Sequence, residues 1–98
     1  MTTRDAILLE PADNVATSLR RIEPGETVSI ATQSGERHVV AAEGIPIFHK
    51  ISVAPLRKGS EILKYGDVIG VLTADVDKGG LVHVHNLRSL RAQGEPRR

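Results

Sequence analysis

The sequence contains no cysteine and very few aromatic residues. Without cysteine the chain has no disulfide, no thiolate zinc site and no cysteine nucleophile. Its Phe and Tyr residues are limited to Phe48 and Tyr65, too few for the stacked surface on which proteins bind single-stranded nucleic acid. The formal net charge is +1 at pH 7, so the chain also lacks a strong electrostatic attraction to nucleic acid. We therefore expect no nucleic-acid partner.

Long hydrophobic runs are also missing. No stretch approaches the roughly 18 apolar residues that a membrane-spanning helix needs. Residues 1–5 lack the apolar run and cleavage site of a secretory signal. We therefore expect no membrane segment and a cytoplasmic location. The 98 residues predict one domain over residues 1–88, followed by a polar, arginine-rich tail over residues 89–98 that we expect to be flexible.

Most of the chain has the pattern of an all-β domain. Short runs rich in valine and isoleucine are separated by glycine or proline every few residues. A first strand is expected within residues 3–9. Further strands are expected at residues 27–31, 37–42, 49–53, 61–63, 68–72 and 81–85. The loop at residues 32–36 is expected to close a hairpin.

Residues 13–21 have a different pattern, which is that of a short helix. Asp13 is a favourable N-cap, and Val15, Ala16 and Leu19 are spaced for one helical face. The two arginines that follow suit the C-terminal end of a helix. The sequence therefore predicts a mainly β domain with one short N-terminal helix.

A weak internal repeat organises the predicted strands. Each copy has an apolar residue, two spacer residues, a glycine, two further residues and a second apolar residue. The copies are residues 22–28, 56–62 and 76–82. Glycine would supply the positive φ needed at the end of a turn. We interpret the repeat as one turn that leads into a strand and is used three times.

The third copy continues into Val82-His83-Val84-His85-Asn86. On a strand, alternate residues share a face, so the two histidines would project together and the two valines would face the core. The histidines are either hydrogen-bonded imidazoles on a half-exposed strand or a functional pair. Such a pair can supply two metal ligands, but the spacing gives no third ligand. Asn86 is either a turn residue with positive φ or an amide ligand.

His49 and Lys50 form a second candidate group. Lys50 would pair with a carboxylate or a sulfonate as a point charge. On a straight strand the two side chains point to opposite faces, so both can serve one site only at a bulge or a strand end. Tyr65 and Gly66 are interpreted as structural, with the ring covering an edge of the core.

Several of these segments together resemble a known family. They are 11–16, 49–53, 56–59, 64–70, 73–76 and 83–87, and they include His-Lys, Lys-Tyr-Gly, Thr-Ala-Asp and His-Val-His-Asn in that order. In this order they are similar to the SAF domain of the altronate and galactarate dehydratase family. They also resemble the small alpha subunit of sulfolactate sulfo-lyase. The resemblance covers residues 8 to 88.

The resemblance implies a β-clip fold and a role in a lyase that acts on hydroxy acids by β-elimination. Because the chain is too short for a whole enzyme, it is either a separate small subunit or a fragment of a longer protein. Its length favours the first, so we expect a small subunit that completes the active site of a larger catalytic subunit. The residues expected to face the substrate are His49, Lys50, His83, His85 and Asn86. His83 and His85 are also the candidate metal ligands, with a divalent metal such as iron or magnesium held mainly by the partner.

A second hypothesis belongs to another class. SAF-type domains also serve as binding modules, so the chain would then bind a small anion or a protein partner and catalyse nothing. A homo-oligomer is a further expectation, because small β domains often bury an apolar face in this way.

Overall fold

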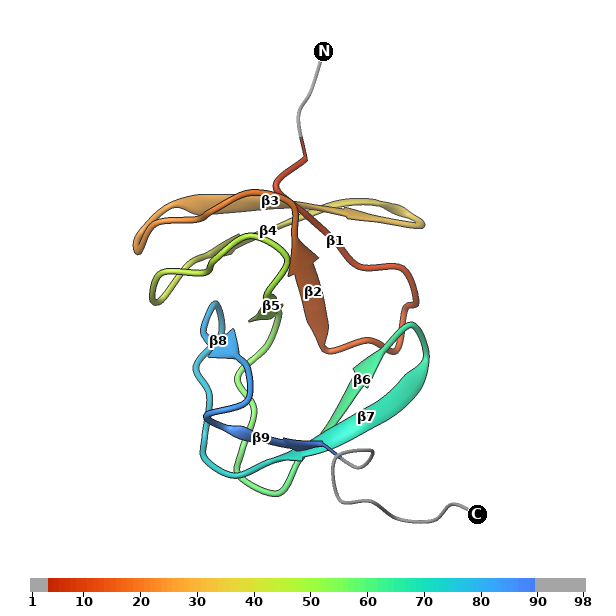
Figure 1. Ribbon diagram of the computed structural model, residues 1–98. Helices are drawn as coiled ribbons and strands as arrows, with labels where there is room; N and C mark the ends of the chain where they lie inside the picture. Colours follow the sequence, from red (N-terminus) through yellow and green to blue (C-terminus); the bar gives the residue numbers. More distant parts are fainter. Residues whose placement is uncertain (1–3, 90–98) are drawn as a thin grey trace.

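The computed structural model describes residues 4–89, and this part of the chain folds into nine β-strands in two sheets (Figure 1). The strands are β1 (Ala6–Ile7), β2 (Val15–Ser18), β3 (Thr27–Thr32), β4 (Gly35–Val40), β5 (Lys50–Ser52), β6 (Glu61–Lys64), β7 (Asp67–Leu72), β8 (Leu81–Val82) and β9 (Leu87–Ser89). The larger sheet has the order β4-β3-β1-β2-β5-β8, and the smaller has β6-β7-β9. Over residues 4–89 there is no helix, and hence none that could cross a membrane. Beyond Ser89 the predicted tail lies outside the described residues.

The helix predicted at residues 13–21 is wrong, because Val15–Ser18 forms strand β2. This strand lies inside the larger sheet, where it pairs antiparallel with β1 on one side and β5 on the other. Both of its faces are buried: Ala16 packs in one hydrophobic cluster and Val15 in another. Pairing on both edges satisfies the backbone N–H and C=O groups, and this tertiary context overrides the local helix pattern.

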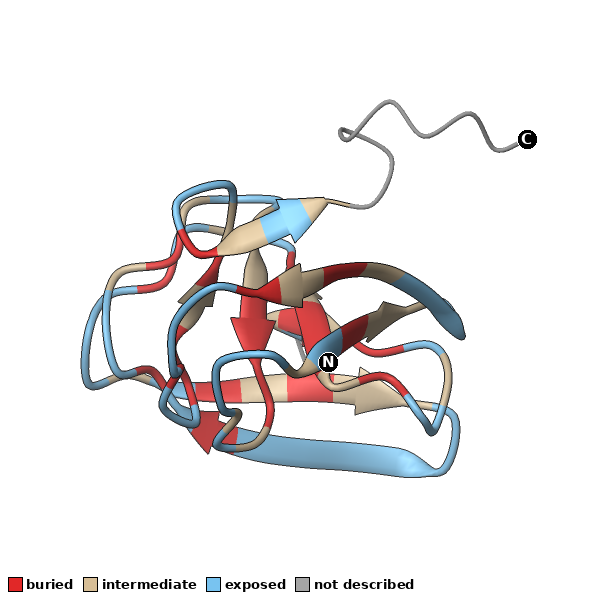
Figure 2. Cartoon of the chain, turned by 90° about the horizontal axis from the view of Figure 1, so that it is seen from below, coloured by how far each residue is buried: buried red, intermediate tan, exposed pale blue. Residues whose placement is uncertain are grey.

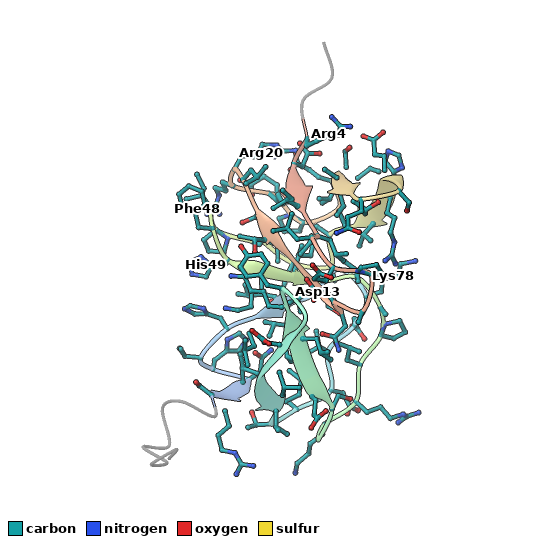
Figure 3. All side chains as sticks on the ribbon, turned by 90° about the vertical axis from the view of Figure 1, so that its right-hand side faces the viewer. Arg4, Asp13, Arg20, Phe48, His49 and Lys78 are labelled. Atoms are coloured by element: carbon teal, nitrogen blue, oxygen red, sulfur yellow. The ribbon has the colours of Figure 1, made fainter. Side chains whose placement is uncertain are left out.

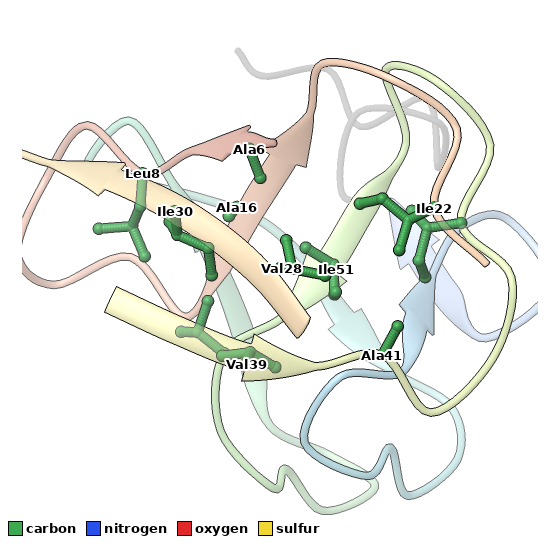
Figure 4. Close-up of a cluster of buried hydrophobic side chains, with 11 residues drawn as sticks. Ala6, Leu8, Ala16, Ile22, Val28, Ile30, Val39, Ala41 and Ile51 are labelled. Atoms are coloured by element: carbon green, nitrogen blue, oxygen red, sulfur yellow. The ribbon is translucent and has the colours of Figure 1, made fainter. Parts of the chain in front are cut away.

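Two hydrophobic clusters hold the fold together. The first lies against the larger sheet and contains residues from β1 to β5 (Figure 4). The second joins the two sheets and consists of Val15, Ile62, Leu72, Val76 and Val82. Exposed residues lie in the loops and along β4, which is one of the two edge strands of the larger sheet (Figure 2). Full burial of each valine, leucine or isoleucine stabilises the fold by about 1.5–3 kcal/mol.

The glycine turn predicted at three places is confirmed, and it occurs a fourth time. Gly25, Gly59 and Gly79 have φ values of 87°, 90° and 87°. Residues 45–51 form the additional copy, in which Phe48 takes the glycine position with a φ of 65°. In each copy the residue after the positive-φ residue donates its N–H to the carbonyl three residues earlier. Backbone bridges pair the copies, through Ile22 with Ile45 and Leu56 with Val76.

The predicted hairpin is confirmed, and a second hairpin, which the sequence did not predict, is fixed by a buried carboxylate. β3 and β4 pair along their whole length, and β6 pairs with β7 across Tyr65 and Gly66. These two residues have φ values of 56° and 81°, as a two-residue type I′ turn requires. Both donate their N–H to the Asp13 carboxylate, each at 2.8 Å. Asp13 therefore anchors a hairpin turn instead of capping a helix (Figure 3).

Candidate functional site

The His-Val-His-Asn segment is not a strand. β8 ends at Val82, and residues 83–86 form a turn. The Asn86 side chain closes this turn: its Oδ1 accepts the His83 N–H at 2.9 Å, and its Nδ2 donates to the Leu81 carbonyl at 2.8 Å. Val82 is fully buried, but Val84 is 81% exposed, so the expectation that both face the core is wrong.

Asn86 is itself a turn residue, which is one of the two interpretations given for it in the sequence analysis. Its side chain is buried and its N–H donates to the His83 carbonyl at 3.0 Å. The expected positive φ is absent, because among residues 4–89 only Phe48 and Tyr65 adopt it without being glycine. In this structure the Asn86 amide holds the loop that carries His83.

His83 lies against His49. The ladder between β5 and β8 pairs Lys50 with Val82, so the next pair outward is His49 opposite His83. Their ring centroids are 4.2 Å apart, with 43° between the planes. The structure thus brings together one histidine from each of the two predicted groups. His83 and His85 would share a face only on a strand, and residues 83–86 form a turn instead.

The His49 ring is oriented by the backbone. Its Nδ1 lies 3.0 Å from the carbonyl oxygen of Ile47. A carbonyl oxygen only accepts hydrogen bonds, so Nδ1 carries the proton in this contact. In the neutral ring Nε2 then keeps its lone pair and is available to accept a proton or bind a ligand.

Lys50 lines an open cavity of about 230 Å³ where the two sheets approach each other. The cavity is lined by Lys50, Ile69, His83, Val84, Leu87 and Ser89. Lys50 is the first residue of β5, and His49 immediately precedes the strand. His49 and Lys50 therefore lie at the start of a strand, which is one of the two positions where both side chains could serve one site.

The charges around this cavity are basic. Burial, and then the neighbouring Lys64 ammonium, lower the pKa of Lys50. Burial also lowers the pKa of His83, followed by the charges of His49, Lys50 and His85. Every charged group that shifts these two pKa values is basic. These five side chains, which we call the basic cluster, would be stabilised by a bound anion.

The predicted metal pair does not form a complete site. Within residues 4–89, no three histidine, aspartate or glutamate side chains lie close enough together to hold a metal ion. A protein zinc site normally uses at least three protein ligands. The described residues of this chain therefore do not fit a self-contained metal centre.

Two residues near the site, Phe48 and Lys64, were not predicted from the sequence. Phe48 directly precedes His49, which together with His83 forms what we call the histidine pair; Phe48 has a positive φ and is 67% exposed. Residues 45–51 match the repeat once a non-glycine residue is accepted at its fourth position, so this copy was detectable. Lys64 had no local signal, because only the packing of β6 against the larger sheet brings its charge close to Lys50.

The fold and the cavity define a small all-β module in which a basic cluster lies at the junction of two sheets. The chain matches the model of the altronate/galactarate dehydratase SAF domain over residues 4–90. It belongs to that family, as the ordered motifs predicted.

Two kinds of relative are similar to this chain. Altronate dehydratase of Escherichia coli is 35% identical over 83 residues, which is 85% of this chain but 16% of that enzyme. The altronate dehydratase of Bacillus subtilis is 32% identical with the same coverage. The alpha subunit of (2R)-sulfolactate sulfo-lyase from Paracoccus pantotrophus is 32% identical over 62 residues, which is 63% of this chain and 92% of that subunit. The chain thus spans about a sixth of the altronate dehydratases and nearly the whole of this alpha subunit.

Proposed function

We propose that this chain is the small subunit of a hydroxy-acid lyase and completes the active site of a larger catalytic subunit. The observation that carries the proposal is the basic cluster, of which half-buried Lys50 and His83 line an open cavity. Family membership and the near-complete coverage of a sulfo-lyase alpha subunit support the same assignment. The substrate class is a hydroxy acid of the altronate or sulfolactate type.

The cluster offers two functions that an elimination needs. Lys50 pairs with the carboxylate or sulfonate of the substrate as a point charge. The lowered pKa of His83 favours its neutral form, which can accept a proton during removal of the hydrogen next to the carboxylate. His49 Nε2 is a second proton acceptor close to His83.

The larger subunit supplies the rest of the site in this proposal. Any divalent metal, such as iron or magnesium, is held mainly by that subunit, because the described residues of this chain offer no complete ligand set. We also propose a β-clip arrangement, supported by the four related turns that pair through two backbone bridges. The cytoplasm is the proposed location.

The test combines this chain with the corresponding catalytic polypeptide of the same genome, meaning the homologue of the part of altronate dehydratase that this chain does not cover. Release of water from altronate and of sulfite from (2R)-sulfolactate is measured with and without the chain. We expect turnover to need the chain, and Lys50→Met to lower it by about 100-fold, because a charge-assisted contact to the anion is lost.

Lys58→Met is the matched control, because Lys58 is an exposed lysine in the turn around Gly59. It should leave turnover within about twofold of the original, as expected for a surface substitution away from the site. Full activity of the larger polypeptide alone would contradict the proposal.

One observation favours a second function, that of an anion-binding module. The cavity and its basic cluster are formed by this chain without a partner. Titration of the isolated chain with altronate and with sulfolactate, followed by calorimetry, separates the two functions. Micromolar binding by the isolated chain, together with no effect on lyase turnover, would favour the binding module.

A further inference from the structure

Phe48 adopts a backbone conformation that is usually taken by glycine, and the turn does not need a phenylalanine there. Its φ is 65°, and the equivalent positions in the other three copies of the turn are glycines. Left-handed backbone is unfavourable for residues with a Cβ and is rare for bulky side chains. The phenyl ring gains little from burial, because the residue is 67% exposed. Strained residues of this kind cluster at functional positions.

Buried Ser18 fixes the turn that presents Phe48. It accepts the Phe48 N–H at 2.9 Å with its carbonyl oxygen and donates its own N–H to the His49 carbonyl at 2.9 Å. Its hydroxyl donates to the Pro46 carbonyl at 2.7 Å. The exposed ring is therefore presented by a well-bonded backbone, which lowers the entropy lost when it binds a partner.

Exposed apolar side chains flank the histidine pair on both chain segments. Ile47 and Phe48 precede His49 and are 47% and 67% exposed. Val84 follows His83 and is 81% exposed. We call Ile47, Phe48 and Val84 the apolar rim. Figure 3 shows Phe48 and His49 on the same side of the molecule. Val84 directly follows His83, whose ring contacts that of His49, and it lines the cavity.

We propose that the apolar rim is the docking surface on which the larger lyase subunit closes over the basic cluster. The inference rests on the proposed function and names the surface that the partner contacts. In the Escherichia coli relative, the part that matches this chain is 16% of a far longer polypeptide, so a much larger protein mass accompanies the module there.

A partner bound to the apolar rim would strengthen anion binding at the basic cluster. Closure over the rim excludes water from the cavity, and the attraction between Lys50 and a bound anion becomes stronger in the lower dielectric. An aromatic side chain in a partner pocket is the usual anchor of such an interface, and valine adds apolar contact around it. The partner surface should therefore be an apolar pocket next to the catalytic groups of the larger subunit.

The experiment measures the dissociation constant between this chain and the catalytic polypeptide of the same genome by calorimetry. Phe48→Asn replaces the ring with a residue that tolerates positive φ, so the turn is kept. We expect it to weaken the complex at least about tenfold, as loss of an aromatic anchor does. Val84→Ser should weaken it several-fold. Thermal unfolding of each isolated variant shows that it is folded.

Leu9→Ser is the matched control, because Leu9 is a 41% exposed apolar residue that follows β1, away from the histidine pair. It should leave the dissociation constant within about twofold, as is usual for surface substitutions. A Phe48→Asn chain that binds as tightly as the original, or a Leu9→Ser chain that is weakened equally, would overturn the rim and leave the proposed function standing. Failure of the original chain to bind would overturn both.

Discussion

Two turns place a residue with a bulky side chain at positive φ, but their surroundings differ. Tyr65 lies in the β6–β7 hairpin, where the Asp13 carboxylate accepts its N–H and that of Gly66. Phe48 lies in the additional copy of the glycine turn, residues 45–51, where its N–H donates to the Ser18 carbonyl and its ring is exposed. The hairpin conformation is explained by the fold. The conformation of Phe48 is tolerated by the fold but is not explained by it.

The difference shows how strain separates a structural position from a functional candidate. At Tyr65 a buried charge supports the backbone, so the conformation contributes to the packing of two sheets. At Phe48 three glycine counterparts show that the same turn forms without a side chain. Selection for something other than folding is therefore the simplest physical account of Phe48.

The largest expected effect tests the support of Tyr65. Asp13→Ala removes the acceptor for the N–H groups of Tyr65, Gly66 and Glu10 and leaves polar groups unpaired near the core. We expect the free energy of unfolding to fall by about 3 kcal/mol, since hydrogen bonds to a charged group contribute about 1.5–3 kcal/mol each and are not additive. Urea denaturation followed by circular dichroism measures this.

The control for Asp13 is Asp75→Ala, because exposed Asp75 accepts a single backbone N–H, that of Lys58, at 2.7 Å. Its loss should cost about 1 kcal/mol. Equal losses for the two variants would mean that Asp13 has no special role, and the comparison between the two turns would fail.

The intermediate effect tests the strain at Phe48. Phe48→Gly relieves the unfavourable backbone but makes the unfolded chain more flexible, so we expect a net gain of about 0.5–1 kcal/mol in the free energy of unfolding. Tyr65→Asn is the parallel change, because Asn-Gly is the preferred type I′ pair, and its gain should stay below about 0.5 kcal/mol. Destabilisation by Phe48→Gly would show that the ring supports the fold after all.

The smallest expected effect is on the pH dependence of stability. It tests His83, whose ring contacts that of His49, the residue after Phe48. The pKa of His83 is lower in the folded chain than its ordinary value of 6.5, through burial and the charges of His49, Lys50 and His85. Below about pH 6.5 the unfolded chain therefore binds more protons at this residue than the folded chain does. As far as His83 is concerned, the free energy of unfolding is therefore highest above about pH 6.5, and it decreases as the pH falls below this value.

Urea midpoints measured between about pH 5 and 8 should therefore vary less in His83→Gln than in the original chain. His38→Gln, on the exposed edge strand β4, serves as the control. An unchanged pH profile in His83→Gln would contradict the proposed environment of His83.

Local signals predicted most of the fold. Glycines with positive φ were expected at three turns, and Gly25, Gly59 and Gly79 adopt it. The hairpin around residues 32–36 was read correctly from the valine- and isoleucine-rich runs on either side. These features succeed because their cause lies within a few residues of the chain.

The errors occur where distant residues decide the structure. Val15–Ser18 becomes a strand because β1 and β5 bond to both of its edges, which no local pattern reveals. The strand expected at residues 81–85 stops after Val82, since the Asn86 amide turns the chain back.

The candidate site could be predicted only in part. The structure brings His49, Lys50 and His83 together, and the contact between the two histidine rings depends on the register of β5 with β8. The substrate roles of these residues, the metal and the homo-oligomer stay predictions.

The larger sheet is joined at its centre by β1, a strand only two residues long. On one side β1 runs parallel to β3, and on the other it pairs with β2. The β3–β4 hairpin thus reaches the rest of the sheet through the two residue pairs of the β1–β3 ladder, and β4 is one of the two edge strands of this sheet, β8 being the other. Segments attached in this way open at lower free energy than the whole domain. We expect this hairpin to be the first cooperative unit to detach, while the histidine pair on the far side of β2 remains folded.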